Sequence, residues 1–506
     1  MKTKRNLLTI LSLSPLSLLV SCAPKGFVKN ITVNSIYAGA GKVRVIGADF
    51  LSPFDTSISA NLYYQENQYT DAELKNIEDT IQESYLYAHA LSDRHYSYYL
   101  EGSDESIVNL KTINDYYGSE TPLVLDPYLY DLLKQSYEFS LVTDGKFNIF
   151  LGTLNDIYET KLEEVHEDRT RSALDAVLEF STNRYFSSFR EEEREQIQKI
   201  TETIPHNRSE MQGILTFDDQ TKSVTFHQYQ NTKNLKISLG GCAKGYATEW
   251  VAEKLQATYP DISLLLNSGF SSIKAIGTRP DGKPWKIRYD NPVYYEQIMP
   301  SKTNYAKNEL SLTIDGPFNL STSGYYNQYF YEYEDGKNIF QRRNHILDAS
   351  TGYSASVFDQ VSVLSDSAFY ADMMTTAIMN ASSVAEANSL IGYLDGYFSK
   401  ETDGLLLSYK TKKGTQIPYS YSMNDYQGLS TESGLPISIL TDGSKYQGTY
   451  EELDVSSVDK VSSTFEPVFE ETYLLSENLY DKASLLSDKD CGTKKPNRIA
   501  VLRKAT

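Results

Sequence analysis

Cysteine is scarce in this 506-residue chain, which contains only Cys22, Cys242 and Cys491. No CxxC pair and no cluster of Cys and His residues occurs, so the sequence gives little support to a zinc site. Basic charge is also in short supply, because 48 Lys and Arg stand against 67 Asp and Glu and leave a net charge of −19. A nucleic-acid-binding surface needs basic residues to replace phosphate counterions, so we expect no nucleic-acid partner.

The N-terminus carries an apolar stretch, Leu7 to Val20, that follows three basic residues. This stretch is too short to span a bilayer comfortably and is typical of a signal peptide. It ends in Leu19-Val20-Ser21-Cys22, which resembles a bacterial lipobox, the motif whose cysteine becomes the lipidated N-terminus after cleavage. We therefore expect residues 1–22 to be a lipoprotein signal peptide and Cys22 to be the lipidation site; an ordinary secretory signal is the alternative. The expected location is the extracytoplasmic face of the cell membrane, with the lipid as anchor.

The periodicity of apolar residues predicts both helices and strands, and no internal repeat is visible. We assign residues 23–45 to a tether that leads into the fold. Residues 431–506 are acidic and Ser-rich before a basic end, so we expect a weakly ordered or peripheral extension there. The predicted elements are strands at 57–64, 264–266 and 285–289, a hairpin at 215–226, and helices over 71–91, 128–142 and 371–390.

The segment Ser238-Leu-Gly-Gly-Cys-Ala-Lys-Gly-Tyr-Ala247 is the most informative part of the chain. Its glycines precede Ala247, Val251 and Leu255, which recur at helical spacing. A glycine-rich turn that opens a helix presents backbone N–H groups at the positive end of the helix dipole. The segment therefore predicts an anion site, with phosphate as the usual occupant.

Two later segments also contain residue types that carry chemistry. His345-Ile-Leu-Asp-Ala-Ser-Thr-Gly352 combines a histidine, an aspartate and hydroxyls in a turn. In Ala371-Asp-Met-Met-Thr-Thr-Ala377, Asp372 and Thr376 are four residues apart and project from one helix face. Their oxygens suit Mg²⁺. The alternatives are a capping role for Asp372 in the first helical turn and a structural, backbone-bonded role for His345.

Five segments occur in an order that matches the motifs of one family. They are Gly240–Ala247 (GGxAKGYA), Asn267–Gly269 with Gly277–Trp285 (NxGG…G…PDGxxW), Ser321–Gly324 (STSG), His345–Gly352 (HIIDPxTG) and Ala371–Ala377 (ADALxTA). Over about residues 50–425 the chain thus resembles the FAD:protein FMN transferase (ApbE) family. The resemblance implies an α+β fold with mixed sheets flanked by helices, of ApbE-like (T-fold-like) architecture, over residues 46–430.

The resemblance also implies a reaction and its participants. FMN would pass from FAD to a Thr or Ser hydroxyl of an extracytoplasmic partner protein, with Mg²⁺ as cofactor and AMP as leaving group. The implied metal ligands are Asp372, Thr376 and the backbone carbonyl of Gly241, and the implied catalytic residues are His345 and Asp372. The implied FAD-binding residues are Phe147, Asn148, Ser238, Lys244, Asn267, Gly324, His345 and Asp348.

Two positions that carry a carboxylate in the family are neutral here. Ser238 stands where the family has an aspartate before Leu-Gly-Gly, and Asn148 stands where it has an aspartate after Phe. Neither side chain offers a charge to a ribityl hydroxyl, a metal-bound water or an adenine amine, so we expect an effect on flavin affinity or rate. Two alternatives to transfer stay open: hydrolysis of FAD to FMN and AMP, and a flavin-binding lipoprotein that has lost catalysis.

Overall fold

The computed structural model describes most of the chain between residues 26 and 486. No helix within this described part has the length and apolar character needed to cross a membrane. The predicted signal peptide and Cys22 lie outside the described residues. The described residues are 26–33, 36–37, 43–45, 50–175, 189–290, 308–325, 328–334, 339–355, 357–382, 386–387, 390, 394, 397, 403–412, 437–439, 469–476, 479 and 482–486.

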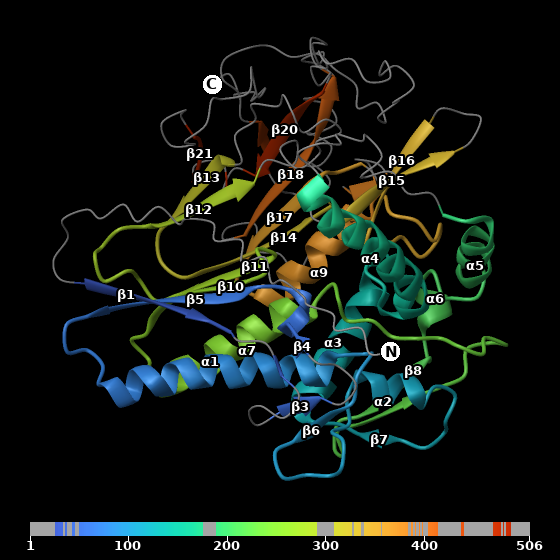
Figure 1. The fold of residues 1–506 in the computed structure, drawn as a ribbon, viewed down its shortest axis with the longest axis horizontal. Helices are drawn as coiled ribbons and strands as arrows, with labels where there is room; N and C mark the ends of the chain where they lie inside the picture. Colours follow the sequence, from blue (N-terminus) through green and yellow to red (C-terminus); the bar gives the residue numbers. More distant parts are fainter. Residues whose placement is uncertain are drawn as a thin grey trace.

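A nine-stranded sheet runs through the middle of the molecule (Figure 1). Its strand order is β1-β5-β10-β11-β14-β17-β18-β20-β19, and the recorded pairings between neighbours are antiparallel. Strands predicted at 57–64 and 264–266 are confirmed as β5 and β10. The strands are β1 Gly26–Thr32, β5 Ile58–Gln65, β10 Ser263–Ser268, β11 Ser272–Ile276, β14 Phe318–Gly324, β17 Gln360–Ser365, β18 Gly404–Lys412, β19 Ile437–Ile439 and β20 Phe469–Ser476.

Helix α7 packs between α1 and α9, and α7 and α9 pack against this sheet (Figure 1). The helices predicted at 71–91 and 128–142 are confirmed as α1 and α3, but the predicted end of the third at residue 390 is wrong. That helix, α9, stops at Met379 because Asn380 leaves the helical path, and its side chain donates to the Lys146 carbonyl at 3.1 Å. The helices are α1 Asp71–Ser92, α2 Leu110–Asp115, α3 Pro127–Val142, α4 Gly152–Asp175, α5 Glu191–Thr201, α6 Arg208–Met211, α7 Ala243–Thr258 and α9 Ala368–Met379, with 3-10 turns η1 Pro53–Asp55 and η2 Ile149–Leu151.

A smaller sheet, β12-β13-β21, shares a hydrophobic core with the nine-stranded sheet, while the helices share a different core. Val361 and Val363 of β17 belong to the helix-side core, and Leu364 of the same strand belongs to the other. Successive side chains of a strand point to opposite faces, so a strand covered on both sides is buried along its whole length, as β17 is. The remaining strands are β2 Ile36–Tyr37, β3 Val43–Val45, β4 Phe50–Leu51, β6 Tyr98–Leu100, β7 Leu123–Val124, β8 Leu215–Asp218, β9 Ser223–Phe226, β12 Trp285–Asp290, β13 Asn308–Ile314, β15 Tyr329–Glu334, β16 Ile339–Asn344 and β21 Ala483–Leu485.

The sheets extend beyond the predicted domain limits at both ends of the chain. Strand β1 lies inside the predicted tether, yet it pairs with β5 along its whole length. Strands β19, β20 and β21 lie inside the predicted C-terminal extension, and β20 pairs with both β18 and β19. Tyr473 and Leu475 of β20 are fully buried, because alternate residues of this strand enter the core below the smaller sheet. The described parts of both segments are therefore built into the fold.

Candidate active site

The glycine turn at residues 239–242 leads into α7, whose first turn contacts the carboxyl group of Asp372 from α9. The backbone N–H groups of Cys242 and Ala243 both donate to the Leu239 carbonyl, at 3.1 and 2.9 Å. The N–H of Gly245, in the first turn of α7, donates to Oδ2 of Asp372 at 2.7 Å. At this helix start, the anion that accepts the Gly245 amide is a side chain of the protein itself and not a phosphate.

Glycine at position 245 is what allows α7 and α9 to approach so closely. A Cβ atom placed on Gly245 would lie 2.4 Å from the Ala368 carbonyl oxygen and 2.9 Å from Oδ2 of Asp372. Contacts that short do not occur between real Cβ atoms and backbone oxygens. The sequence motif therefore joins two segments that are 127 residues apart, and it places the acid at the turn.

Asp372 is a buried carboxyl and not the cap of its own helix. Ser367 caps α9 by accepting a hydrogen bond from the Tyr370 backbone, which leaves Asp372 in the second turn. The Ser321 hydroxyl of β14 contacts Oδ1 of Asp372, so both carboxyl oxygens have partners. Burial raises the pKa of Asp372 to about 6, although Lys244 and these hydrogen bonds act in the opposite direction.

The other two predicted metal ligands lie together one helical turn further along α9. Oγ1 of Thr376 is 3.4 Å from the carbonyl oxygen of Gly241. Adjacent oxygen ligands of an octahedral Mg²⁺ ion lie about 3 Å apart, since each metal–oxygen distance is about 2.1 Å. The carboxylate, hydroxyl and carbonyl oxygens present here fit Mg²⁺. Phe147 closes the other side, because a Cβ on Gly241 would lie 3.3 Å from its ring.

Lys244 acts electrostatically on both predicted catalytic residues. Its charge lowers the pKa of Asp372 and also that of His345. His345 reaches solvent, yet neighbouring protein atoms also desolvate its imidazole ring. This desolvation, followed by the Lys244 charge, lowers the pKa of His345 to about 4, against an opposing hydrogen bond with the Gln328 backbone. Within the described ranges, no carboxylate forms an ion pair with Lys244, so its ammonium can meet an anionic ligand.

The turn between β10 and β11 lies against the same group of residues. Oδ1 of Asn267 accepts the Phe270 N–H at 2.9 Å and thereby shapes the turn. The Ser271 carbonyl accepts the Thr322 N–H at 2.7 Å and lies 2.9 Å from the Ser321 hydroxyl, which contacts Asp372. Asn267 is thus brought to the edge of the site. Gly324 ends β14 three residues beyond Ser321 and pairs with Gln360 of β17.

Three predicted FAD-binding residues use their polar side-chain atoms within the protein. Asn148 accepts the Phe150 N–H and donates to the Pro205 carbonyl, both at 2.8 Å. Asp348 pairs with Lys146 at 2.8 Å, and Ser350 donates to its second oxygen. The Ser238 hydroxyl accepts from Asn155 at 3.0 Å. These contacts support the local fold, and the two positions that lack the family's carboxylate have neutral partners.

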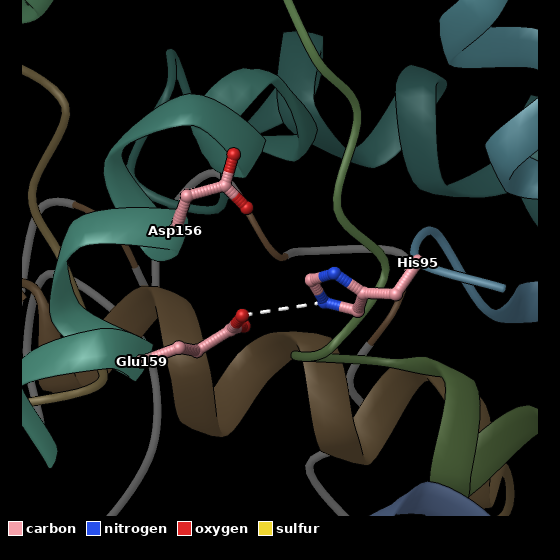
Figure 2. A group of neighbouring side chains, drawn as sticks. All are labelled: His95, Asp156 and Glu159. Atoms are coloured by element: carbon pink, nitrogen blue, oxygen red, sulfur yellow. Dashed lines mark ion pairs between the residues drawn. The ribbon is translucent and has the colours of Figure 1, made fainter. Parts of the chain in front are cut away.

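The structure also reveals a cluster that the sequence motifs did not indicate. His95, Asp156 and Glu159 lie together, with the His95 ring directed at Glu159 (Figure 2). Nε2 of His95 is 3.3 Å from Glu159, and Arg94 lies 2.5 Å from Asp156 and 2.6 Å from Glu159. Lys236 pairs with Asp156 at 2.7 Å. Two carboxylates therefore face two permanent cations, and the cluster is a balanced ion-pair network rather than an open metal site.

The sequence signal for this cluster was the spacing of Asp156 and Glu159 on one helix face, and such spacing is common on solvated helices.

Comparison with known proteins agrees with the motifs. The model of the ApbE family matches residues 54–393, which is most of the chain. The chain belongs to the ApbE family. The prediction of the family is confirmed, and at that level so is the assignment to the FAD:protein FMN transferases.

Solved structures of ApbE proteins resemble this chain at low sequence identity. An ApbE protein from Thermotoga maritima is 21% identical, with 72% of this chain and 94% of that chain covered and a TM-score of 0.47. The flavin transferase ApbE from Vibrio cholerae is 15% identical, with 76% and 94% covered and a TM-score of 0.46. The flavinyl transferase ApbE from Pseudomonas stutzeri, in its apo form, is 17% identical, with 76% and 92% covered and a TM-score of 0.46. No curated protein matches the chain.

Proposed function

We propose that the protein is a Mg²⁺-dependent enzyme that transfers FMN from FAD to a Ser or Thr hydroxyl of a partner protein and releases AMP. One observation carries the proposal. Asp372 of α9 meets the Gly245 amide at 2.7 Å, while Thr376 of the same helix meets the Gly241 carbonyl. Segments that are distant in sequence thus converge on a set of oxygen donors next to a lysine, as binding of a metal and a diphosphate requires.

Each group has a defined task in this proposal. The Gly241 carbonyl, Asp372 and Thr376 would hold Mg²⁺, which when bound would supply positive charge to the diphosphate. Lys244 adds a second positive charge and orients the diphosphate. His345 is neutral at pH 7 because its pKa is lowered, so it can accept the proton of the attacking hydroxyl. A bond forms from that hydroxyl oxygen to the FMN-side phosphorus, and the bond from this phosphorus to the AMP oxygen breaks.

The test is a transfer reaction with FAD, Mg²⁺ and an acceptor domain that carries a Ser/Thr-Gly-Ala-Ser/Thr stretch. The wild-type protein should produce a fluorescent acceptor band on a denaturing gel, and Asp372→Ala should abolish it. Asp156→Asn is the matched control, because this acid belongs to the balanced network, and it should leave the band in place. A dark acceptor with the wild-type chain at saturating FAD contradicts the proposal.

Hydrolysis of FAD is the second candidate, and solvent exposure of His345 favours it. Water that reaches this histidine could replace the acceptor hydroxyl and give free FMN and AMP. Chromatography of a reaction without acceptor separates the two activities, since only hydrolysis releases FMN there. Metal-independent FAD binding without either product would instead indicate a flavin-binding protein that has lost catalysis.

The proposal includes a lipid anchor at Cys22, supported by the basic residues, apolar stretch and lipobox-like end of residues 1–22. The anchor would hold the enzyme on the extracytoplasmic face of the membrane, where the acceptor protein would also lie. Cys22→Ala should move the protein from the membrane fraction to the soluble fraction. An unchanged distribution between these fractions contradicts the anchor.

A further inference from the structure

Phe270, in the turn between β10 and β11, is an exposed aromatic residue in an unfavourable backbone conformation. Its side chain is 61% exposed, and its φ is +60°. Glycine adopts this left-handed region freely, whereas for other residues this conformation costs roughly 1–2 kcal/mol of conformational free energy. Glycine at this position would avoid both the backbone strain and the exposure of an apolar ring to solvent. The chain nevertheless has phenylalanine here.

The turn that carries Phe270 is held rigidly beside the candidate active site. Asn267 accepts the Phe270 N–H, and the next residue, Ser271, is tied through its carbonyl to Ser321 and Thr322. Ser321 contacts the Asp372 carboxyl. Phe270 therefore lies one residue from a group that is connected directly to the proposed metal ligand.

A second loop with unfavourable backbone angles contacts the same turn. Phe54 and Asp55 have φ values of +53° and +51°. Gly269 donates to the Ser57 carbonyl at 3.0 Å, and a Cβ on Gly269 would lie 2.2 Å from Oγ1 of Thr56. Three non-glycine residues with left-handed angles thus lie on two loops in contact, and such strain is concentrated at functional sites.

The two phenylalanines of these loops differ in what their rings touch. The Phe54 ring packs edge-on against His89 with centroids 5.3 Å apart. Across the described part of the chain, no ring pairs with Phe270. In sequence Phe270 lies between Gly269 and Ser271, so neither chain neighbour places a large apolar side chain beside its ring, as a protein-docking hot spot would. An isolated flat ring on a rigid turn suits a flat ligand better than a protein surface.

We propose that Phe270 is a stacking platform for one of the two planar heteroaromatic rings of the dinucleotide, isoalloxazine or adenine, whose diphosphate would lie beside Lys244 and the proposed Mg²⁺ ligands. This inference rests on the proposed function, because it requires that FAD be bound. Stacking of a heteroaromatic base on an aromatic side chain contributes about 1–3 kcal/mol. That contribution would offset the conformational cost of Phe270 and explain why the turn does not carry glycine.

The test compares Phe270→Gly with Phe270→Trp by isothermal titration with FAD, FMN and ADP, each with Mg²⁺. Phe270→Gly should weaken FAD binding by roughly 5- to 150-fold, which corresponds to the stacking contribution. The same variant should raise the thermal unfolding temperature, because glycine relieves the left-handed strain. Phe270→Trp should keep the FAD affinity. Loss of affinity for FMN identifies isoalloxazine as the stacked ring, and loss for ADP identifies adenine.

Phe27, which is 47% exposed on edge strand β1, provides a matched control, and Phe27→Ala should leave all three affinities unchanged. An equal FAD affinity in wild type and Phe270→Gly overturns the platform and leaves the proposed function intact. The same holds if only the KM for the acceptor protein rises, since the ring would then contact the partner. A wild-type protein that does not bind FAD overturns the proposed function and the platform together.

Discussion

Two groups of acidic residues in this molecule differ in the charges that balance them. Asp372 is buried near a single lysine, Lys244, and burial raises its pKa to about 6. Asp156 and Glu159 are also partly removed from water, which alone would raise their pKa values. Contacts with Lys236 and Arg94 for Asp156, and with His95 and Arg94 for Glu159, outweigh that desolvation and lower both pKa values.

The difference indicates which group awaits a ligand. A buried carboxylate with too little positive charge around it destabilises the protein in its ionised form, and a bound cation removes that penalty. A carboxylate already paired with arginine or lysine gains little from a metal and would place the metal beside another cation. The raised pKa of Asp372 therefore supports the proposed Mg²⁺ site, whereas the carboxylates around Glu159 already have cationic partners.

The largest expected effect follows from removing the unbalanced acid. Asp372→Asn keeps the size of the side chain but removes the charge that would hold Mg²⁺ in the proposed function. Because changes to residues that merely support metal ligands cost about 10–100-fold, we expect loss of a ligand to lower flavin transfer by more than about 100-fold. Initial rates measured over a range of Mg²⁺ concentrations give this number. Asp156→Asn should retain the wild-type rate, and equal losses in both variants would remove the distinction between the two groups.

Thr376 tests whether the second side-chain ligand contributes. Thr376→Val preserves shape and removes the hydroxyl that lies 3.4 Å from the Gly241 carbonyl. We expect the Mg²⁺ concentration for half-maximal rate to rise by about 10–100-fold, in line with other disturbed metal sites. Thr376→Ser restores a hydroxyl and should recover most of the affinity. Failure of serine to restore it would show that packing of the methyl group, rather than the oxygen, matters at this position.

The pH dependence of the two groups should differ in sign. The folded pKa of Asp372, about 6, exceeds its unfolded value of 3.8, so the folded protein holds the extra proton between these values. Without metal, the contribution of Asp372 to stability is therefore retained at low pH and lost as pH rises from 4 to 6, by about 3 kcal/mol in total. The lowered pKa values of Asp156 and Glu159 act in the opposite direction, because their contribution is lost as pH falls below their unfolded values.

Magnesium should reverse the penalty at Asp372. Above pH 6 the carboxylate is ionised and ready to bind, and Mg²⁺ at 100 times its Kd would stabilise the fold by about 2.7 kcal/mol. One pH unit below the pKa the apparent affinity should fall about tenfold, since a proton competes with the metal. Thermal unfolding with and without Mg²⁺ at pH 5 and 7.5 measures both effects. An Mg²⁺ shift in Asp372→Asn equal to that of wild type would place the metal elsewhere.

The sequence contains recognisable motifs at the candidate site but none in the outer strands of the fold, and the reason is physical. Gly245, Asp372 and Thr376 lie in short motifs, and close packing constrains Gly245 while the proposed Mg²⁺ site would constrain the other two, so each could be recognised individually. Strand β20 has no such motif, and it is stabilised by pairing with β18, which is distant in sequence. Local composition around β20 is acidic and Ser-rich, and so it predicted a peripheral extension.

Residues whose role depends only on the tertiary structure were also missed. Ser321 lies in a recognised motif, but only the packing of β14 beside α9 shows that its hydroxyl contacts Asp372. The prediction of a phosphate site at the start of α7 has the same limit. Periodicity identified the start of α7, but it could not show that the Gly245 N–H donates a hydrogen bond to a carboxylate from α9. Such contacts between distant segments leave no local signal in either one.

The smallest expected effect on metal-dependent turnover comes from the balanced group. Arg94→Ala removes the cation that contacts both Asp156 and Glu159, and its side chain is only 7% exposed. We expect a loss of about 2 kcal/mol in unfolding free energy, below the range for fully buried pairs because both acids are partly solvated. The Mg²⁺ dependence of the rate should not change.

The acid limb of the pH–rate profile should move to higher pH in the same variant. Glu159 raises the pKa of His345, and without Arg94 beside it the charge of Glu159 would raise that pKa further. An altered Mg²⁺ affinity in this variant would mean that the two acidic groups work as one, and the contrast between them would fail.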